Sequence, residues 1–357
     1  MGRLDYRARG RKSDMSTETV TGRAEPKRRP ARSIRRAGVW LVQHRESSVL
    51  VVDLLVMAYF FTVSATFLSH GNIVTLSQFT ASWAVIGAGL AMVLICAEID
   101  LSVGMTFAFA PIIMWWVGLS HGLPLIPSIL IGLVAAIVVG AINGMITVYL
   151  RVHSFLTTLG MFFLLTGLNV TLTNGAPQVT PLPNTVTDWL GQSDFSEIIW
   201  ALIVVAVLHV VLRHTSWGVS TLATGGNPIG ASEAGINTGL VKIGNFMIAA
   251  FLAGFMGILE AFRIQSIDPL SGSADLMFLS VSAAVIGGTS LLGGEGTIIG
   301  ALLGAVLLAA LKDGFTLTGV SAFTFNIILG IAVLLAIALN IYVAKLRGLR
   351  RQAGEAA

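Results

Sequence analysis

Long apolar runs, separated by short polar breaks, cover most of the chain after residue 48. A helix that crosses a lipid bilayer needs roughly 20 mostly apolar residues. Because no water is available at membrane depth to pair with backbone groups, such runs must be helical. The pattern predicts an all-α polytopic membrane protein with about ten transmembrane helices, some of them short or broken. The ten runs are about 49–68, 79–97, 102–119, 126–149, 155–172, 197–212, 243–262, 276–292, 297–311 and 323–342.

The amino-acid composition also indicates a membrane protein. Hydrophobic residues make up 55% of the 357 residues and charged residues only 11%, whereas a soluble domain carries ~25% charged residues. The mean hydropathy is +0.83. These values exclude a soluble enzyme, a disordered protein and a nucleic-acid-binding protein. The single cysteine, Cys96, excludes an internal disulfide and a cysteine-based metal site.

Basic residues gather at the two ends of the chain. Of the 22 Lys and Arg residues, 12 lie within residues 1–37 and four within residues 343–357. We expect 1–46 to be a disordered, basic cytoplasmic arm, 47–342 to be the transmembrane domain and 343–357 to be a basic cytoplasmic tail. With both termini in the cytoplasm, 20 of the 22 basic residues lie on that side, in agreement with the positive-inside rule.

Charged residues within the apolar region are few, and each is a candidate for function because burying charge in a membrane is costly. Asp53 and Glu260 lie near the ends of their runs, where they can reach the interface. Glu98 and Asp100 lie in the break between two runs, where Asp100 or Ser102 is also placed to cap the next helix. A functional and a structural interpretation of Asp100 both remain open.

The chain lacks the GxxxxGKS/T loop that holds nucleotide phosphates and the HExxH pattern of zinc peptidases. Its six histidines are scattered near the ends of the apolar runs, which is typical of interfacial positions. We therefore expect no catalytic residues, no metal site and no cofactor bound by this chain.

The longest predicted cytoplasmic loop, 213–242, contains a second informative stretch. Residues 225–228 (GGNP) form a turn signature, and 229–236 could then form a short helix with Asn227 as its cap and Pro228 in its first position. Such a helix could dock into a groove of a partner, or the stretch could be an ordinary connection. The spacing alone favours neither interpretation.

Glycines spaced four residues apart predict places where helices approach closely. Gly296, Gly300 and Gly304 share one face of a predicted helix, and Gly140 and Gly144 repeat the spacing elsewhere. We expect the first three to be packing glycines.

Four stretches of the chain form an ordered set of motifs. The first is CAEIDLSVG at 96–104. The second runs from NG at 143–144 through RV at 151–152 to SFLTTLG at 154–160. The third runs from GGNP at 225–228 to AGIN at 234–237, and the fourth is IGGTSLLGGEG at 286–296. In this order they resemble the segments GGIDLSVG, NG…RVPPFIVTLG, GGNPEAARLSGIN and IGGTSLFGGRGS of the ribose/xylose/arabinose-type permeases of ABC sugar importers. The resemblance covers about residues 80–330.

The chain departs from that family pattern at a few positions. Ala97 and Glu98 stand where the family has paired glycines, Glu295 stands for an arginine, and His153-Ser154 stands for Pro-Pro. The extra charge of Glu98 within the break indicates either a different solute or a different break of the helix. These departures bear on the identity of the solute rather than on the family.

The resemblance implies a multi-pass permease subunit in the bacterial cytoplasmic (inner) membrane, surrounded by lipid. Its expected partners are a second permease copy in a homo- or heterodimer, a cytoplasmic ATPase that holds the ATP and Mg, and an extracytoplasmic sugar-binding protein. No nucleic acid is expected. The solute would be a monosaccharide or a related small polar molecule, moved by alternating access.

Two sets of residues are the candidate functional sites under this interpretation. Polar groups near broken helices, Asp100, Ser102 and Asn143, are candidates for the solute path. The loop 213–242 is the candidate segment for docking and coupling to the ATPase. The coupling residues are Gly226, Asn227, Pro228, Ala231, Glu233, Ala234 and Gly235.

Other classes of protein remain as alternatives. A stand-alone secondary carrier or channel would transport without ATP. A membrane-embedded enzyme or receptor would need a catalytic constellation or a soluble domain, and the sequence shows neither. Among importers of other solutes, the permeases of branched-chain amino-acid importers are the most similar class.

Overall fold

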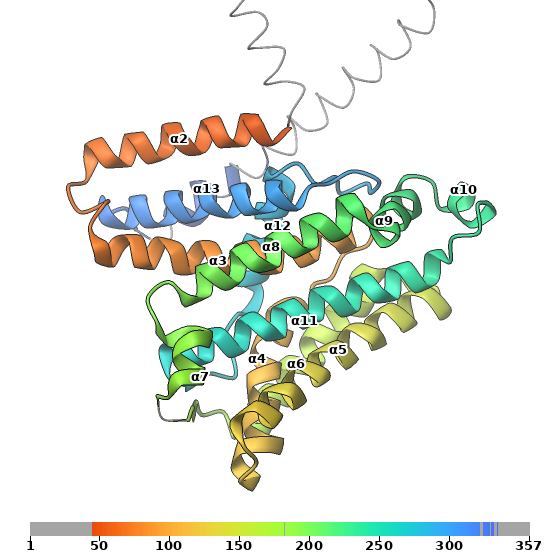
Figure 1. Ribbon diagram of the computed structural model, residues 1–357, viewed down its shortest axis with the longest axis horizontal. Helices are drawn as coiled ribbons and strands as arrows, with labels where there is room; N and C mark the ends of the chain where they lie inside the picture. Colours follow the sequence, from red (N-terminus) through yellow and green to blue (C-terminus); the bar gives the residue numbers. More distant parts are fainter. Residues whose placement is uncertain (1–44, 182, 322–323, 329, 332–333, 335–357) are drawn as a thin grey trace, which may run out of the picture. The chain divides into compact units, whose positions relative to one another are not determined.

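The computed structural model describes residues 45–181, 183–321, 324–328, 330, 331 and 334, all within the compact unit Leu41–Ala357. The predicted arm 1–46, apart from its last two residues, and the predicted tail 343–357 lie outside the described residues. So does most of the tenth apolar run, 323–342. Figure 1 shows the arrangement of the helices, coloured along the sequence.

The first half of the described chain consists of long helices. After α4 the chain continues through a π turn, Met114–Gly118, and a 3₁₀ turn, Leu119–His121. Pro111 lies inside α4, where it lacks the N–H of a regular helical turn, and the irregular π turn follows it closely. The helices are α2 (Arg45–Val63), α3 (His70–Ile95), α4 (Val103–Ile113), α5 (Leu125–Tyr149) and α6 (Ser154–Leu172).

The second half adds longer connections. Two short strands, β1 (Gln178–Val179) and β2 (Ser266–Ile267), pair antiparallel and join the segment after α6 to the segment after α11. The helices are α7 (Thr185–Thr187), α8 (Ser196–His214), α9 (Ser216–Gly226), α10 (Pro228–Glu233), α11 (Thr238–Ile264), α12 (Ser273–Ile286) and α13 (Ile298–Leu317).

Eight helical stretches of the described chain are long and apolar enough to cross a membrane, and α12 is a shorter apolar helix. Together they correspond to the first nine of the ten apolar runs. The prediction of an all-α polytopic membrane protein with some short or broken helices is confirmed. The shortness of α12 has a visible cause, because Gly287 ends the helix and a glycine-rich loop follows it.

Two helices, α3 and α11, form the centre of the bundle. Every residue of α3 from Thr80 to Ile95 is buried, as expected for a helix that is apolar on all sides. In α11, apolar residues line contacts with α3, α4 and α5. Small residues allow these contacts: a Cβ at Gly144 would come within 2.7 Å of the Ile243 Cα. Figure 1 shows α13 between α2 and α3, in agreement with its packing against both.

Candidate translocation site and coupling segment

The two ends of the bundle differ in charge, and we call them the inner end and the outer end. The inner end is the end at which α5 finishes and α11 begins. It carries Arg151, Arg213 and Lys242, and the positive-inside rule predicts that it faces the cytoplasm. The outer end is the opposite one, where α11 finishes next to Arg263.

At the inner end, residues 96–102 break the helical path between α3 and α4. The backbone leaves the helix at Ala97, which has a φ of 60°. The neighbouring helix α6 holds the break through its side chains: Ser154 Oγ accepts from the Ile99 N–H at 3.1 Å, and Thr158 Oγ1 donates to the Ile99 carbonyl at 3.3 Å. The side chains of α6 thus supply hydrogen bonds that a helix would have supplied within itself.

The break brings the three predicted path residues together. Asp100 Oδ1 accepts from the Ser102 N–H at 2.9 Å and from the Ser102 hydroxyl at 2.6 Å. Asn143 Nδ2 of α5 donates to Ser102 Oγ at 2.8 Å. All three residues are fully buried. Asp100 therefore stabilises the turn at the start of α4. It also belongs to a polar cluster between α4 and α5.

This cluster contains unsatisfied polar atoms. Among the described residues, Asp100 Oδ2, Asn143 Oδ1 and Thr147 Oγ1 are buried and have no hydrogen-bond partner. Most buried polar atoms in proteins are paired with protein groups or water, because an unpaired one costs about 1–3 kcal/mol. Two of these atoms belong to the cluster, and Thr147 lies one helical turn further along α5; a water molecule or another polar group at these positions would supply the missing hydrogen bonds.

An ion pair joins the break to α11. Lys242 Nζ donates to Glu98 Oε1 at 2.5 Å, and the two side chains are 25% and 11% exposed. The pair borders a cavity of about 440 Å³ at the inner end, which also has Thr147, Arg151 and His153 in its walls. Small-molecule sites typically occupy about 300–1,000 Å³, so this cavity is large enough for one.

The outer end is packed more tightly. Arg263 Nε donates to Glu197 Oε1 of α8 at 3.2 Å, and Arg263 also pairs with Glu260 at 2.5 Å and reaches Gln78 of α3 at 3.5 Å. The Glu197 side chain is only 2% exposed. A network of this kind anchors three helices to one another.

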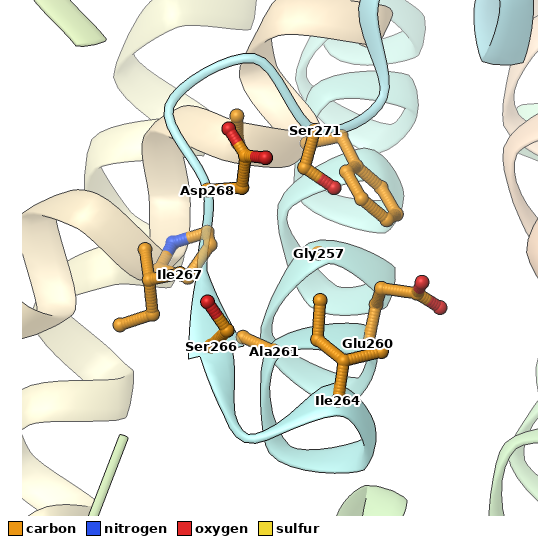
Figure 2. Close-up of a pocket in the computed structure, with 11 residues that line it drawn as sticks. Gly257, Glu260, Ala261, Ile264, Ser266, Ile267, Asp268 and Ser271 are labelled. Atoms are coloured by element: carbon orange, nitrogen blue, oxygen red, sulfur yellow. The ribbon is translucent and has the colours of Figure 1, made fainter. Parts of the chain in front are cut away.

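A small pocket lies beside this network. It holds about 10 Å³, which is room for about one water molecule. Figure 2 shows Asp268 and Ser271 on the loop after β2, above the Gly257 turn of α11, with the Glu260 side chain pointing away from Asp268. In this structure the larger of these two openings therefore lies at the inner end.

The predicted coupling segment forms a protruding helical pair. α9 and α10 meet at Asn227, whose Oδ1 accepts from the Gly230 N–H at 3.0 Å, with Pro228 in the first position of α10. The helix ends three residues before the predicted boundary at 236, because Gly235 has a φ of 84°. Figure 1 shows α10 at the edge of the bundle.

The residues of this segment are mostly exposed. Gly226, Asn227, Pro228, Glu233, Ala234 and Gly235 are exposed, and Ala231 is buried. Ile229 stands out, since it is a large apolar side chain that is 74% exposed at an end of the bundle predicted to face the cytoplasm.

Glycines connect the coupling segment to the break. A Cβ at Gly225 would overlap the carbonyl oxygen of Ile95, the last residue of α3. The Gly294 N–H donates to that same carbonyl at 2.8 Å. We call Ile95, Gly225 and Gly294 the inner seam. No side chain separates the three segments there, so α9 and the end of α3 meet in direct backbone contact.

The three predicted packing glycines lie in different settings. Gly300 and Gly304 are on α13, where a Cβ would overlap the carbonyl oxygens of Gly287 and Ala283. Gly296 precedes α13 and faces the Ile95 side chain. The three glycines therefore do not share one helical face, because α13 begins only at Ile298.

Sequence reasoning missed Lys242, Thr147 and the pairing of Arg263 with Glu197. The two ionic pairs join residues far apart in the chain, with a sequence separation of 144 for Glu98 and Lys242 and of 66 for Glu197 and Arg263. A signal for the first pair was present, since Glu98 is an isolated charge within an apolar stretch and such charges usually find partners.

A bundle of membrane-crossing helices with a broken helix, buried polar groups at the break and a protruding segment at one end is the architecture expected of a membrane permease component. The family model described as branched-chain amino acid transport system / permease component matches residues 72–338, and the chain belongs to this family. Its curated relatives are permease proteins, and several of them are named for import systems.

Three of these relatives illustrate the range of systems. The xylose/arabinose import permease protein XylH of Sulfolobus acidocaldarius is 35% identical over 85% of this chain and 86% of its own length. The ribose import permease protein RbsC of Escherichia coli is 32% identical over 90% of this chain and 98% of its own length. The autoinducer 2 import system permease protein LsrC of Photorhabdus luminescens is 31% identical over 82% of this chain and 89% of its own length. No solved structure matches this chain.

Proposed function

We propose that this chain is the membrane-spanning permease subunit of an ATP-binding-cassette importer that moves a monosaccharide or a related small polar solute into the cell. Its proposed location is the bacterial inner membrane, with both termini in the cytoplasm. The similarity to permeases named for ribose and for xylose/arabinose supports a sugar as the solute.

The proposed partners follow from what the chain contains. It has no nucleotide-binding loop, so a cytoplasmic ATPase would bind ATP and Mg and supply the energy. A second permease copy and an extracytoplasmic sugar-binding protein would complete the importer. The loops after α6 and after α11, at the outer end, are the proposed surface for the binding protein.

The observation that carries the proposal is the exposed α10 helix with its direct links into the bundle. Ile229 offers an apolar contact to the ATPase. From α10 the chain passes through Gly235 to Asn237, whose side chain caps α11 by accepting from the Leu240 N–H at 3.0 Å. A movement of α10 therefore reaches α11 within a few residues, and reaches α3 through the inner seam.

Alternating access would then use two arrangements of the same helices. Closure of the ATPase would move α10, and the connected ends of α3 and α11 would change the width of the inner end. The solute would enter from the binding protein while the inner end is closed and leave when it opens.

The test is affinity purification of tagged chain from its native membranes, with mass spectrometry of stoichiometric partners. We expect an ATPase with a nucleotide-binding loop to copurify with the wild type. The Ile229→Asp variant should lose the ATPase while remaining inserted. The control Val179→Asp changes another highly exposed apolar residue, in β1 at the outer end, and should retain the ATPase. Purification without any ATPase, or equal ATPase recovery with both variants, would contradict the proposal.

A further inference from the structure

We propose that Asn245 of α11 is a positioning residue for energy coupling. It holds α9, the end of α3 and the first turns of α11 together, so that movement of the coupling segment reaches both central helices as one unit. We call the four residues whose side chains meet there the junction: Cys96, Trp217, Thr221 and Asn245. This inference rests on the proposed importer function and adds to it the residue that connects the ATPase-facing segment to the bundle.

The junction brings three segments of the chain together around one amide. Trp217 Nε1 of α9 donates to Asn245 Oδ1 at 2.9 Å. Asn245 Nδ2 donates to Thr221 Oγ1 of α9 at 3.2 Å and to Cys96 Sγ, at the end of α3, at 3.1 Å. Because an indole N–H can only donate, it fixes the oxygen of the amide toward Trp217, and the two N–H groups then point to Thr221 and Cys96.

The junction is buried where polar groups are costly. Asn245 and Thr221 have no exposed surface, and Cys96 is 1% exposed. Polar side chains inside a membrane protein are rare and usually pair with one another across helices. An apolar residue would fill position 245 without needing three partners, so the amide indicates a requirement for a defined geometry. A buried polar network whose groups are all paired holds its neighbours rigidly.

Close packing of the backbone accompanies these hydrogen bonds. A Cβ at Gly244, next to Asn245, would overlap the Trp217 ring, so the indole lies directly against the backbone of α11. At the other end of α9, a Cβ at Gly225 would overlap the Ile95 carbonyl oxygen of the inner seam. α9 is therefore in contact with α11 near its beginning and with α3 at its end, and the junction adds hydrogen bonds to both helices.

α9 connects the exposed α10 helix to the junction. Asn227 belongs to both helices of the coupling segment, because its N–H donates to the Ala223 carbonyl of α9 at 3.0 Å and its side chain caps α10. α9 packs against α3, α8 and α11, whereas α10 packs mostly against α9. Figure 1 shows α10 beyond α9 at the edge of the bundle. A force on α10 therefore passes first to α9, and the junction delivers it to α3 and α11 at the same time.

The first experiment follows the junction without a known solute. Hydrogen exchange of the assembled importer is measured by mass spectrometry, with and without ATP and vanadate, in α10, at the end of α3 and in the first turns of α11. Asn245→Leu is the test variant and Asn169→Leu is the matched control. Asn169 is also a fully buried amide, but its Nδ2 donates to the Met105 carbonyl at 3.2 Å and joins α6 to α4.

In the wild type and in Asn169→Leu, we expect ATP to change the exchange rates of all three segments about fivefold. In Asn245→Leu the change should persist in α10 and be lost at α3 and α11. An ATP response at both central helices that survives Asn245→Leu, or its loss in both variants alike, would overturn the junction. A wild type without any ATP response at α3 and α11 would overturn it as well.

The second experiment measures uptake of labelled D-ribose or D-xylose per ATP hydrolysed by the reconstituted importer. Thr221→Val keeps the shape of the side chain and removes the hydroxyl that accepts from Asn245, whereas Thr221→Ser keeps the hydroxyl. We expect Thr221→Val to hydrolyse ATP normally and to lower the uptake per ATP about fivefold. Thr221→Ser should keep the wild-type ratio. A purely structural role would lower hydrolysis and uptake together, and such an unchanged ratio in Thr221→Val would contradict the proposal.

Failure of the junction and failure of the importer function give different results. Wild-type uptake without ATP, or purification without an ATPase, would contradict the importer function itself. ATP-dependent wild-type uptake with an unchanged ratio in Thr221→Val would leave the importer function in place and remove only the role of the junction. Because the exchange measurement needs no solute, it decides on the junction whichever molecule the importer carries.

Discussion

The two ends of α11 are held in different ways. At the outer end Arg263 contacts Glu197 of α8, Gln78 of α3 and Glu260 of its own helix, beside a pocket with room for about one water molecule. At the inner end Lys242 has one ionic partner, Glu98, at the edge of a cavity of about 440 Å³.

This difference indicates which end of the helix is free to move. A network that joins three helices around a Glu197 side chain only 2% exposed resists displacement, because separating Arg263 from it leaves a buried charge without a partner. A single pair beside an open cavity can exchange its partner for water at small cost. We therefore propose that the outer end is the anchor and that the inner end is the part that would respond to the predicted coupling segment.

The largest expected effect comes from breaking the outer anchor. Arg263→Met leaves the buried Glu197 without its cation and should lower the free energy of unfolding by about 3–5 kcal/mol. Denaturant unfolding of the detergent-solubilised subunit measures this loss. Adding Glu197→Gln should recover at least half of it, and Arg213→Met, at an exposed position, should change it by less than about 0.5 kcal/mol. Equal effects at positions 263 and 213 would contradict the anchor.

The next effect concerns the packing of α11 near the outer end. A Cβ at Gly257 would overlap the Phe107 carbonyl oxygen of α4, whereas Gly167 of α6 has open space around its Cβ position. Gly257→Ala should therefore cost about 2–3 kcal/mol of unfolding free energy. Gly167→Ala should be neutral or stabilise the helix by up to about 1 kcal/mol. Similar melting temperatures for the two variants would show that α4 and α11 are not held at this contact.

A smaller effect is expected at the inner end. Glu98→Gln removes the partner of Lys242, but Lys242 can reach water in the adjacent cavity. The expected loss of unfolding free energy is about 1 kcal/mol, smaller than that of Arg263→Met in the same assay. A loss as large as that of Arg263→Met would mean that the inner end is as rigid as the outer end.

The smallest effect belongs to an exposed pair at the outer end. His70 Nε2 lies 3.0 Å from Asp194 Oδ2, but the side chains are 74% and 60% exposed. His70→Gln should change the free energy of unfolding by less than about 0.5 kcal/mol, because solvent screens such pairs. A change above 1 kcal/mol would show that distance alone, rather than burial, decides the strength of pairs in this bundle.

Much of the fold follows from local features of the sequence. Apolar length alone predicts the positions of the long helices, since a membrane leaves the backbone few choices. The short α10 helix is equally local, because Asn227 caps it and Pro228 begins it. The meeting of Asp100 with Ser102 needs only two residues of chain.

The contacts that distinguish the two ends are not local. Lys242 meets Glu98, and Arg263 meets Glu197, only after the helices have packed, and periodicity contains no information on which helices become neighbours. The expectation that Gly296 shares a helical face with Gly300 failed for a related reason. A turn residue, rather than the four-residue spacing, decides where α13 begins, since Thr297 caps it through the Gly300 N–H.

The most direct measurement is solute uptake into proteoliposomes that contain the purified chain, with and without its copurified ATPase and binding protein. The account predicts uptake of labelled D-ribose or D-xylose only when all components and ATP are present, and no uptake by the chain alone. Uptake by the chain alone in ATP-free liposomes would contradict the account and identify a stand-alone carrier.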